Sequence, residues 1–341
     1  MNLYLNLGKV NMQKGVVLIS TLIIVLMLSS IAALITKDFF LVLNNDKQLS
    51  FSNDAYFLVD FAESIAKEKI LEYVSSVDKD DVSYSSFFDS EYQYDYENML
   101  ISVKISDAST CFNINSIFTK QDQGYVLDSN LSESFFRFLD NGAFSNTQKQ
   151  RLVDQISDWV DYDQEVKEMG LEDYFYTGPA YENQTYTGGR LFYHISELYN
   201  LPATTQLNLD LDDLNICAYP IIKEFVININ MLSVKDINLL RSIFPKLLPD
   251  QAELILSAIE DEKVSDLTYL KERFPKYDFS QNSSSLSYSF YPSLFKLTTT
   301  VSYDEKKAFI ESVILLDDSS VNVRKKPVSR FKHISQQVYG I

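Results

Sequence analysis

A run of twenty residues without a charge constrains this chain more than any other feature of its sequence. The run occupies residues 16–35, reads VVLISTLIIVLMLSSIAALI, and lies between Lys14 and Lys37. At about 1.5 Å of rise per residue, a helix of this length covers the roughly 30 Å hydrocarbon core of a bilayer. The sequence therefore predicts one membrane-spanning helix, with Lys9 and Lys14 on its cytoplasmic side.

Three kinds of N-terminal segment can contain such a run. A secretory signal peptide usually has an apolar region of only about 7–15 residues, although Ala32-Ala33 is similar to the small residues of a cleavage site. An uncleaved signal anchor is the second kind. The third fits best, because a basic leader that ends in Gly15 directly before the apolar run resembles the processing site of type IV prepilins. This resemblance implies cleavage by a prepilin peptidase between Gly15 and Val16, with either Met1 or Met12 as the start.

The fifth residue after this cleavage would be Ser20. Most pilins and pseudopilins carry Glu there, and that Glu is thought to pair with the amino terminus of a neighbouring subunit. A carboxylate inside the bilayer is costly unless it is paired, and a subunit with nothing beyond it has no partner to offer. The K-type minor pseudopilins lack this Glu, so Ser20 is the first residue that indicates a resemblance to the K type.

Beyond the apolar run, residues of low polarity recur at three- and four-residue steps over 53–74, which predicts that the helix continues with one face against a sheet. Strands are predicted over 99–106, 225–230, 294–302 and 306–316. Helices are predicted over 133–139, 147–160, 234–243, 249–259 and 265–273. The acidic, Tyr-rich stretch 78–98 lacks a clear period and predicts a loop, and the basic stretch 324–333 predicts an exposed tail.

Three local patterns resemble the K-type pseudopilins of type II secretion systems. They are Asp107 followed by Asn113-Ile-Asn115, the acidic stretch 158–176 with Ser196-Glu-Leu198 after it, and FVININ over 225–230 followed by helices. The second of these patterns is the most specific. Together with the prepilin-like start, the resemblance covers nearly the whole chain.

The resemblance implies an α+β fold, in which a long N-terminal helix packs on an antiparallel sheet as in pilins, with a large, mainly helical (SAM-like) insertion. The expected parts are a leader (1–15), the transmembrane part of the helix (16–36), the first part of the pilin-like domain (37–111), a first helical SAM-like subdomain (112–224), a second helical subdomain (225–285), the last pilin-like strands (286–325) and a tail (326–341). Such a bulky insertion suits the tip of a filament better than its interior.

The function implied by the resemblance is that of a minor pseudopilin, of the general secretion pathway protein K type. It would form and cap the pseudopilus tip with I- and J-type minor pseudopilins, for the export of folded proteins across the outer membrane. The chain would cross the inner membrane once, with its body in the periplasm. The alternative from the residues alone is a membrane-anchored periplasmic module that binds ligands in the presence of calcium, outside any filament.

Four carboxylates form the strongest candidate for a metal site. Asp161, Asp163, Glu172 and Asp173 lie within thirteen residues, and hard oxygen ligands from a flexible loop suit Ca²⁺. The spacing departs from an EF-hand, which would need Gly where Val166 stands. A solvated acidic loop is the alternative to a metal site. The resemblance favours structural calcium, because K-type pseudopilins bind it in this region, and Asp158 would either assist the site or cap a helix.

The two cysteines, Cys111 and Cys217, are separated by 106 positions. In an oxidising periplasm an even pair favours a disulfide, which would join the two edges of the first helical subdomain. Two buried free thiols are the alternative.

Charge and motif content argue against two other classes of function. The formal net charge of −17 repels phosphate backbones, so we expect no nucleic-acid partner. The two histidines, His194 and His333, are far apart in the sequence, and the chain has no catalytic or phosphate-binding motif such as G-x-S-x-G or H-E-x-x-H. We therefore expect a structural protein rather than an enzyme, with a tethered hydrolase as the least favoured hypothesis.

Overall fold

The computed structural model describes residues 10–76, 87–88, 90–122, 124–140, 144–179, 181, 184–207, 209, 211, 214–304, 306–316 and 331–339. The chain divides into two compact units, one ending at Leu58 and the other beginning at Val59, and each is considered by itself. Most of the predicted leader lies outside the described residues, as does most of the basic stretch 324–333.

A single helix, α1, extends over Val10–Ser76 and contributes to both units. In the first unit, the apolar run from Val16 onward has its side chains exposed. Among the described residues, α1 is the one helix that is long and apolar enough to cross a bilayer, with a mean hydropathy of 2.7 over its most apolar window. This agrees with the predicted membrane anchor. Gly15 and Val16 both lie within α1, and cleavage between them stays a prediction.

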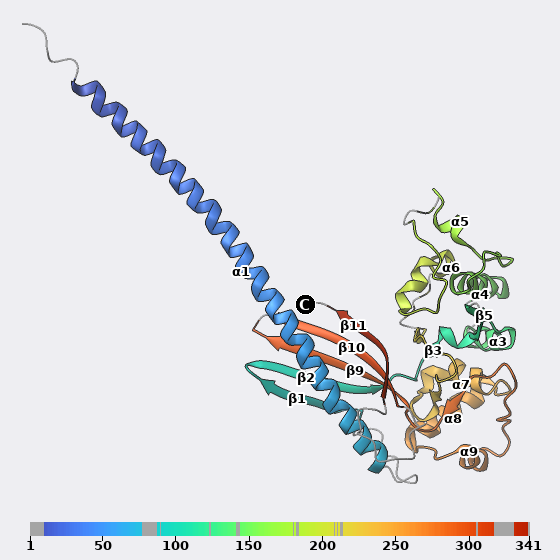
Figure 1. Cartoon of the computed structure of the whole chain (residues 1–341). Coiled ribbons are helices and arrows are strands. Elements are labelled where there is room, and N and C mark those ends of the chain that lie inside the picture. Colours follow the sequence, from blue (N-terminus) through green and yellow to red (C-terminus); the bar gives the residue numbers. More distant parts are fainter. Residues whose placement is uncertain are drawn as a thin grey trace, which may run out of the picture. The chain divides into compact units, whose positions relative to one another are not determined.

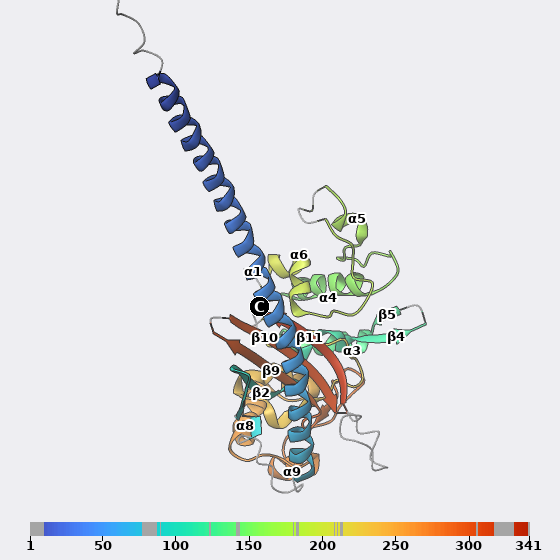
Figure 2. The same ribbon diagram turned by 60° about the vertical axis from the view of Figure 1, so that its left-hand side comes forward.

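The second unit contains an antiparallel sheet of five strands in the order β1-β2-β9-β10-β11 (Figure 1). The strands are β1 (Glu91–Tyr96), β2 (Met99–Asp107), β9 (Leu294–Tyr303), β10 (Lys306–Leu316) and β11 (Phe331–Tyr339). The C-terminal part of α1 crosses one face of this sheet in both views (Figures 1 and 2). In α1, Ala62 and Ala66 are buried one helical turn apart, as expected for a helix with one face on a sheet. In β2, every second residue is buried, namely Ile101, Val103 and Ile105.

The predicted loop over 78–98 is wrong where it meets β1. The six residues of β1 pair with β2 from Glu91↔Lys104 to Tyr96↔Met99. The turn between the strands consists of Glu97 and Asn98, which have positive φ angles of 46° and 69°. This is the conformation that a two-residue hairpin requires. Three tyrosines alternate with polar residues along β1, so the period of two is present, but it is confined to six residues of an acidic stretch.

The predicted tail over 326–341 is wrong where it includes β11. This strand pairs with β10 from Phe309↔Tyr339 to Leu316↔Phe331, with an irregularity beside Val313 and Ile314. His333 of β11 places its Nε2 3.5 Å from Oε1 of Glu63, a buried residue of α1. The strand therefore belongs to the sheet and contacts the helix that crosses it.

The insertion between β2 and β9 consists of two helical parts. The first contains β3 (Phe112–Asn113), η1 (Ile114–Ile117), β4 (Phe118–Gln121), β5 (Gly124–Leu127), α3 (Ser129–Phe138), α4 (Asn146–Val160), α5 (Asp173–Tyr176), η2 (Ile195–Asn200), α6 (Pro202–Gln206) and β6 (Ile216–Cys217). The second contains β7 (Ile227–Asn228), η3 (Ile229–Met231), η4 (Val234–Asp236), α7 (Ile237–Ile243), α8 (Pro249–Asp261), α9 (Leu267–Arg273) and β8 (Tyr288–Ser289). These elements and the sheet confirm the predicted α+β class.

Each helical part opens with the same arrangement of two asparagines. Asn113 and Asn228 end a two-residue strand and cap the short helix that follows, each accepting a bond from the backbone N–H two residues later. Asn115 and Asn230 then hold a distant loop. The side-chain oxygen of Asn230 accepts from the N–H of Val264 at 2.9 Å, and its amide donates to the carbonyl of the same residue at 2.7 Å.

Asn115 repeats this contact in the first part. Its oxygen accepts from the N–H of Phe192 at 2.9 Å, and its amide donates to the Phe192 carbonyl at 2.8 Å. Buried amide groups are costly without partners, so these asparagines fix the loops that they bind. The Asn-x-Asn pairs noted in the sequence are therefore structural anchors.

The base of the first helical part is closed covalently. A disulfide joins Cys111 and Cys217, at the ends of the parallel pair β3 and β6. No free cysteine remains in the chain, since these two are its only cysteines. The cross-link joins the beginning of the first part to its last strand.

Candidate metal centre

Three of the four predicted carboxylates come together after the C-terminus of α4. Ligand oxygens of Asp161, Asp163 and Glu172 all lie within 4.8 Å of one another. Asp161 directly follows α4 and Glu172 directly precedes α5, so the loop between these two helices brings them together. Asp163 is exposed, whereas Asp161 and Glu172 are only 5% and 1% exposed.

The buried members of this cluster have oxygens without hydrogen-bond partners among the described residues. These atoms are Oδ1 of Asp161 and both carboxylate oxygens of Glu172. Burying an ionised carboxylate is strongly unfavourable unless a counter-charge or hydrogen bonds compensate for the lost hydration. The arrangement therefore suits a bound cation.

Burial also raises the pKa values of these groups. It raises the pKa of Glu172 to about 8 and that of Asp161 to about 6, and repulsion between the neighbouring acidic groups adds to both shifts. The Lys167 ammonium partly offsets the shift of Asp161, from 3.8 Å away. A divalent cation between the carboxylates would favour their charged forms.

Two carboxylates on α4 hold the loop that carries Glu172. Asp158 accepts bonds from the backbone N–H of Lys167 at 3.3 and 3.2 Å, and Asp154 accepts from that of Met169 at 3.1 Å. Gly170 packs so closely on Asp158 that an added Cβ would overlap its carboxylate. The sequence left the role of Asp158 open and missed Asp154, although one helical turn separates them on α4.

Asp173 lies outside the three-carboxylate cluster. Its Oδ1 accepts from both the backbone N–H and the hydroxyl of Thr187, each at 2.7 Å, and its Oδ2 accepts from Gln164 at 3.4 Å. It therefore connects two segments of the loop region. Three of the four carboxylates predicted as ligands therefore lie in the cluster and Asp173 lies beside it, and metal binding stays a prediction.

The donor set fits Ca²⁺ by its chemistry. All three side chains offer hard oxygens, and a cavity lined by Tyr125, Tyr162 and Asp163 lies beside Asp161. Calcium takes 6–8 oxygen ligands, so three carboxylates leave positions for backbone carbonyls or water. The described residues provide no histidine or thiol in this cluster, which makes it a poor match for zinc.

The long helix on a five-stranded antiparallel sheet, with a helical insertion between neighbouring strands, defines the class of pilin-like subunits. Residues 110–220 match the family model described as "Type II secretion system (T2SS), protein K". The chain is 24% identical over 250 residues to "Putative type II secretion system protein K" of Escherichia coli K12, covering 72% of this chain and 74% of that protein.

A second relative is "Type II secretion system protein K" of Pectobacterium carotovorum subsp. carotovorum, 25% identical over 245 residues, covering 68% of this chain and 70% of that protein. The fold is similar to a chain in the crystal structure of the GspK-GspI-GspJ complex from enterotoxigenic Escherichia coli, with a TM-score of 0.58, 17% identity, and coverage of 87% of this chain and 100% of that chain. These comparisons confirm the resemblance seen in the sequence. The chain is similar to the protein K family of type II secretion systems, in sequence over residues 110–220 and in its fold.

Proposed function

We propose that this chain is a minor pseudopilin of the protein K type, which forms and caps the tip of a periplasmic pseudopilus together with I- and J-type minor pseudopilins, for the export of folded proteins across the outer membrane. A similar fold occurs in the crystal structure of the GspK-GspI-GspJ complex, which supports these partners. The role is structural: the chain contributes shape and contacts to the assembly rather than catalysis.

The proposed position at the tip rests on Ser20, the fifth residue after the predicted cleavage site. Its hydroxyl donates to the carbonyl of Val17 at 2.9 Å, so its polar group is satisfied within its own helix. It offers no carboxylate to the amino terminus of a further subunit. A subunit of this kind suits the end of a filament, beyond which nothing has to be bound.

An end-specific label tests this position. We expect pseudopili assembled in cells to carry an antibody against the insertion at one end only. The control is an antibody against the major pseudopilin, which should label the whole length. If the insertion antibody labelled the whole length of the filament, the tip role would be contradicted. If the chain did not co-purify with the I- and J-type subunits, the proposed partners would be contradicted.

We propose further that the chain is anchored in the inner membrane with its body in the periplasm, and that a prepilin peptidase cleaves between Gly15 and Val16. The charge-free run and the basic residues before it support this arrangement. Mass spectrometry of the mature N-terminus, with and without the peptidase, tests it. A peptidase-dependent start at Val16 is expected, and an intact N-terminus in peptidase-competent cells would favour a calcium-dependent anchored module instead.

The third element of the proposal is calcium held by Asp161, Asp163 and Glu172, with Asp173 as a neighbour outside the cluster. The unpartnered oxygens of Asp161 and Glu172 support it, because a cation would supply the charge that these buried groups lack. Calcium would fix the loop between α4 and α5. Its role is therefore proposed as structural, and its test is given in the Discussion.

A further inference from the structure

The two cysteines of the disulfide differ in their exposure. Cys111 is only 8% exposed and belongs to a hydrophobic cluster, whereas Cys217 is partly exposed and packs against that cluster from outside. Thiol–disulfide exchange begins when a thiolate attacks one of the two sulfur atoms, and its rate depends on access to that atom. Access therefore favours attack on Cys217.

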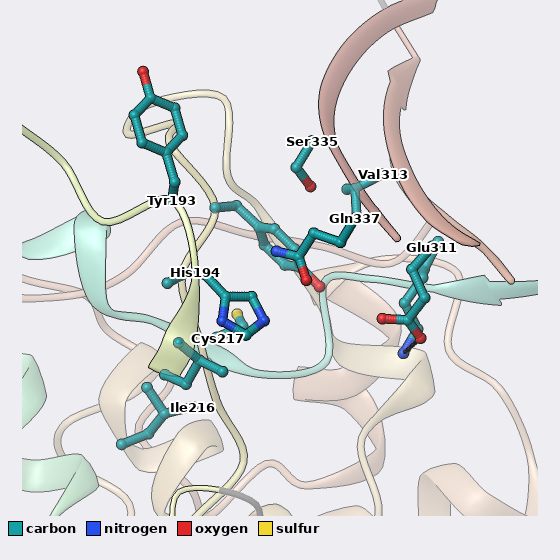
Figure 3. Close-up of a pocket in the computed structure, with 12 residues that line it drawn as sticks. Tyr193, His194, Ile216, Cys217, Glu311, Val313, Ser335 and Gln337 are labelled. Carbon is teal, nitrogen blue, oxygen red and sulfur yellow. Dashed lines mark ion pairs between the residues drawn. The ribbon is translucent and has the colours of Figure 1, made fainter. Parts of the chain in front are cut away.

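A cavity of about 370 Å³ lies beside Cys217 (Figure 3). Its wall includes Cys217 of β6, Val313 of β10 and Ser335 of β11, so it lies between the insertion and the sheet. Cys111 is not among the described residues that line it. The volume is roughly ten times the ~30 Å³ that one water molecule occupies in the liquid. A small thiol can therefore enter the cavity and reach Cys217.

The charges of the cavity wall and of the whole chain indicate which thiols are admitted. Lys296 and Glu311, on neighbouring strands of the sheet, both line the cavity and pair with one another at 3.5 Å. Because these two charges balance, an anionic thiol gains little at the wall. The net charge of −17 repels it from the surface as well. The cavity therefore suits a small uncharged thiol.

A thiol formed at Cys111 would have a hydrogen-bond acceptor. The sulfur of Cys111 lies 3.5 Å from the carbonyl oxygen of Ala108. A thiol is a weak donor, and burial in apolar surroundings favours the neutral thiol over the thiolate. Cys111 can therefore act as the leaving group and remain buried as a protonated thiol.

Hydrogen bonds hold the two ends of the first helical part together beside the cross-link. The N–H of Phe112 donates to the carbonyl of Asn215 at 2.9 Å. The side chain of Asn113 accepts from the N–H of Tyr219 at 3.0 Å and donates to the carbonyl of Ile221 at 3.0 Å. These bonds join the same two segments as the disulfide, so we expect the first part to stay folded when the disulfide opens.

We propose that Cys217 is a site of reversible S-thiolation by small uncharged thiols, and that the cavity holds the added group. The thiolate of the reagent attacks Sγ of Cys217 and forms a new S–S bond there, while the S–S bond to Cys111 breaks. Its electron pair stays on Cys111, which takes up a proton from water. Attack of Cys111 on the mixed disulfide reverses the reaction. The proposal goes beyond the proposed function, because it concerns a covalent modification rather than assembly.

Brief treatment of the folded full-length protein in detergent with 2-mercaptoethanol tests the proposal. Free thiols are then blocked with N-ethylmaleimide, and peptides are analysed by mass spectrometry without reductant. We expect the mercaptoethanol adduct on Cys217 at least ten times more often than on Cys111, with the maleimide on Cys111. Adducts mainly on Cys111, equal adducts on both, or adducts that form only in urea would overturn the proposal.

Two single-cysteine variants test the difference in access without a competing partner thiol. Cys111→Ser and Cys217→Ser lose the same cross-link, and each keeps one thiol. With bis(2-hydroxyethyl) disulfide as the probe, the remaining Cys217 should form the mixed disulfide at least ten times faster than the remaining Cys111. Thermal unfolding establishes that both variants are folded, and equal rates in folded variants would contradict the proposal.

A further pair of variants tests the role of the cavity. Ser335→Tyr fills the cavity and should slow the 2-mercaptoethanol reaction at Cys217 at least tenfold, whereas Gln336→Tyr, at the next and exposed position, should leave the rate unchanged. If Ser335→Tyr does not fold, Ser335→Val adds less bulk and should slow the reaction at least twofold. An unchanged rate in a folded Ser335 variant would show that the reagent does not approach through the cavity.

Discussion

The side-chain amide of Asn228 donates a 2.7 Å hydrogen bond to the carboxylate of Asp107, a residue 121 positions earlier in the chain. Both residues are buried, and Asp107 also accepts from the backbone N–H of Ser109 at 2.7 Å. Asp107 is the last residue of β2, and Asn228 is the last residue of β7. This bond therefore ties the sheet directly to the start of the second helical part.

Replacing Asn228 by Ala should destabilise the protein strongly. The change removes a bond to a buried carboxylate and leaves that group partly unsatisfied, which typically costs about 1–3 kcal/mol or more. Urea denaturation measures the free energy of unfolding. The matched control is Asn130→Ala at an exposed position of α3, which should change it by less than about 0.5 kcal/mol. Equal effects of the two changes would show that the Asn228–Asp107 bond contributes little.

The Asp107 carboxyl should give folding stability a pH dependence. Burial raises its pKa above the ordinary value of 3.8, although bonds from Ser109 and Asn228 lower it in part. The folded chain therefore keeps a proton that the unfolded chain releases. Stability should consequently fall as pH rises from the unfolded pKa through the folded pKa.

Asp107→Asn keeps a polar group at this position without an ionisable proton. The difference in unfolding free energy between the variant and the wild type should shift in favour of the variant as pH rises above about 4. Urea titrations at several pH values between about 4 and 8 measure this difference. A difference that is constant over the whole range would contradict the raised pKa.

Gly170 should not tolerate a side chain. An added Cβ would overlap the Asp158 carboxylate, which holds the loop before Glu172, so Gly170→Ala should cost about 1–3 kcal/mol through overpacking. Gly189→Ala is the contrasting variant. It has open space around it but a φ of 54°, so only the backbone cost of about 1 kcal/mol is expected. Thermal unfolding ranks the two, and a milder effect at Gly170 would argue against the close packing.

Calcium should stabilise the wild type and have little effect on Glu172→Gln. A ligand at a hundred times its dissociation constant adds about 2.7 kcal/mol to folding stability. Removing a buried carboxylate from the cluster should eliminate most of that gain. The midpoint of thermal unfolding in calcium chloride, compared with that in a chelator, measures the response.

The matched control for the calcium experiment is Asp173→Asn. Asp173 is adjacent in sequence but binds Thr187 rather than joining the cluster, so this variant should keep most of the calcium response while losing some stability in both conditions. A lost response in Asp173→Asn with a normal response in Glu172→Gln would exchange the roles assigned to these two residues.

Removing the Cys111–Cys217 cross-link by a double Cys→Ser change should destabilise the first helical part. In the chain-entropy model, a cross-link that closes a loop of about 100 residues contributes about 4.7 kcal/mol, and less where the native state is strained. Urea denaturation of the wild type in the absence and presence of a reductant provides the comparison. Reduction without any shift of the midpoint would contradict a stabilising role.

Elements with a strong periodic signal could be predicted from the sequence, and elements at the sheet edges could not. The charge-free run and the apolar steps after it predicted α1, and apolar β2, β9 and β10 were predicted close to their bounds. Strands β1 and β11 were missed because each has only one neighbour and is partly exposed. The pairing of β1 with β2 is nevertheless local, across a two-residue turn, and its three tyrosines alternate with polar residues, whereas β11 shows no such alternation.

The carboxylate cluster was predictable as a region of the chain but not as a set of side chains. Glu172 is the extended residue before α5 and Asp173 is the first residue of α5, so their two side chains point in different directions. Spacing alone therefore cannot tell which of the two faces Asp161. The choice depends on Thr187, which binds Asp173 from a segment fourteen positions later.

The insertion leaves the sheet and returns to it at one place. The N–H of Ala108 donates to the carbonyl of Leu294 at 2.9 Å, and Asp107 pairs with Phe295 across β2 and β9. The two strands would thus meet in the same way if a short hairpin replaced everything between them. Evolution can therefore enlarge, trim or exchange this module while the scaffold below it keeps its register, and a laboratory graft could use the same junction.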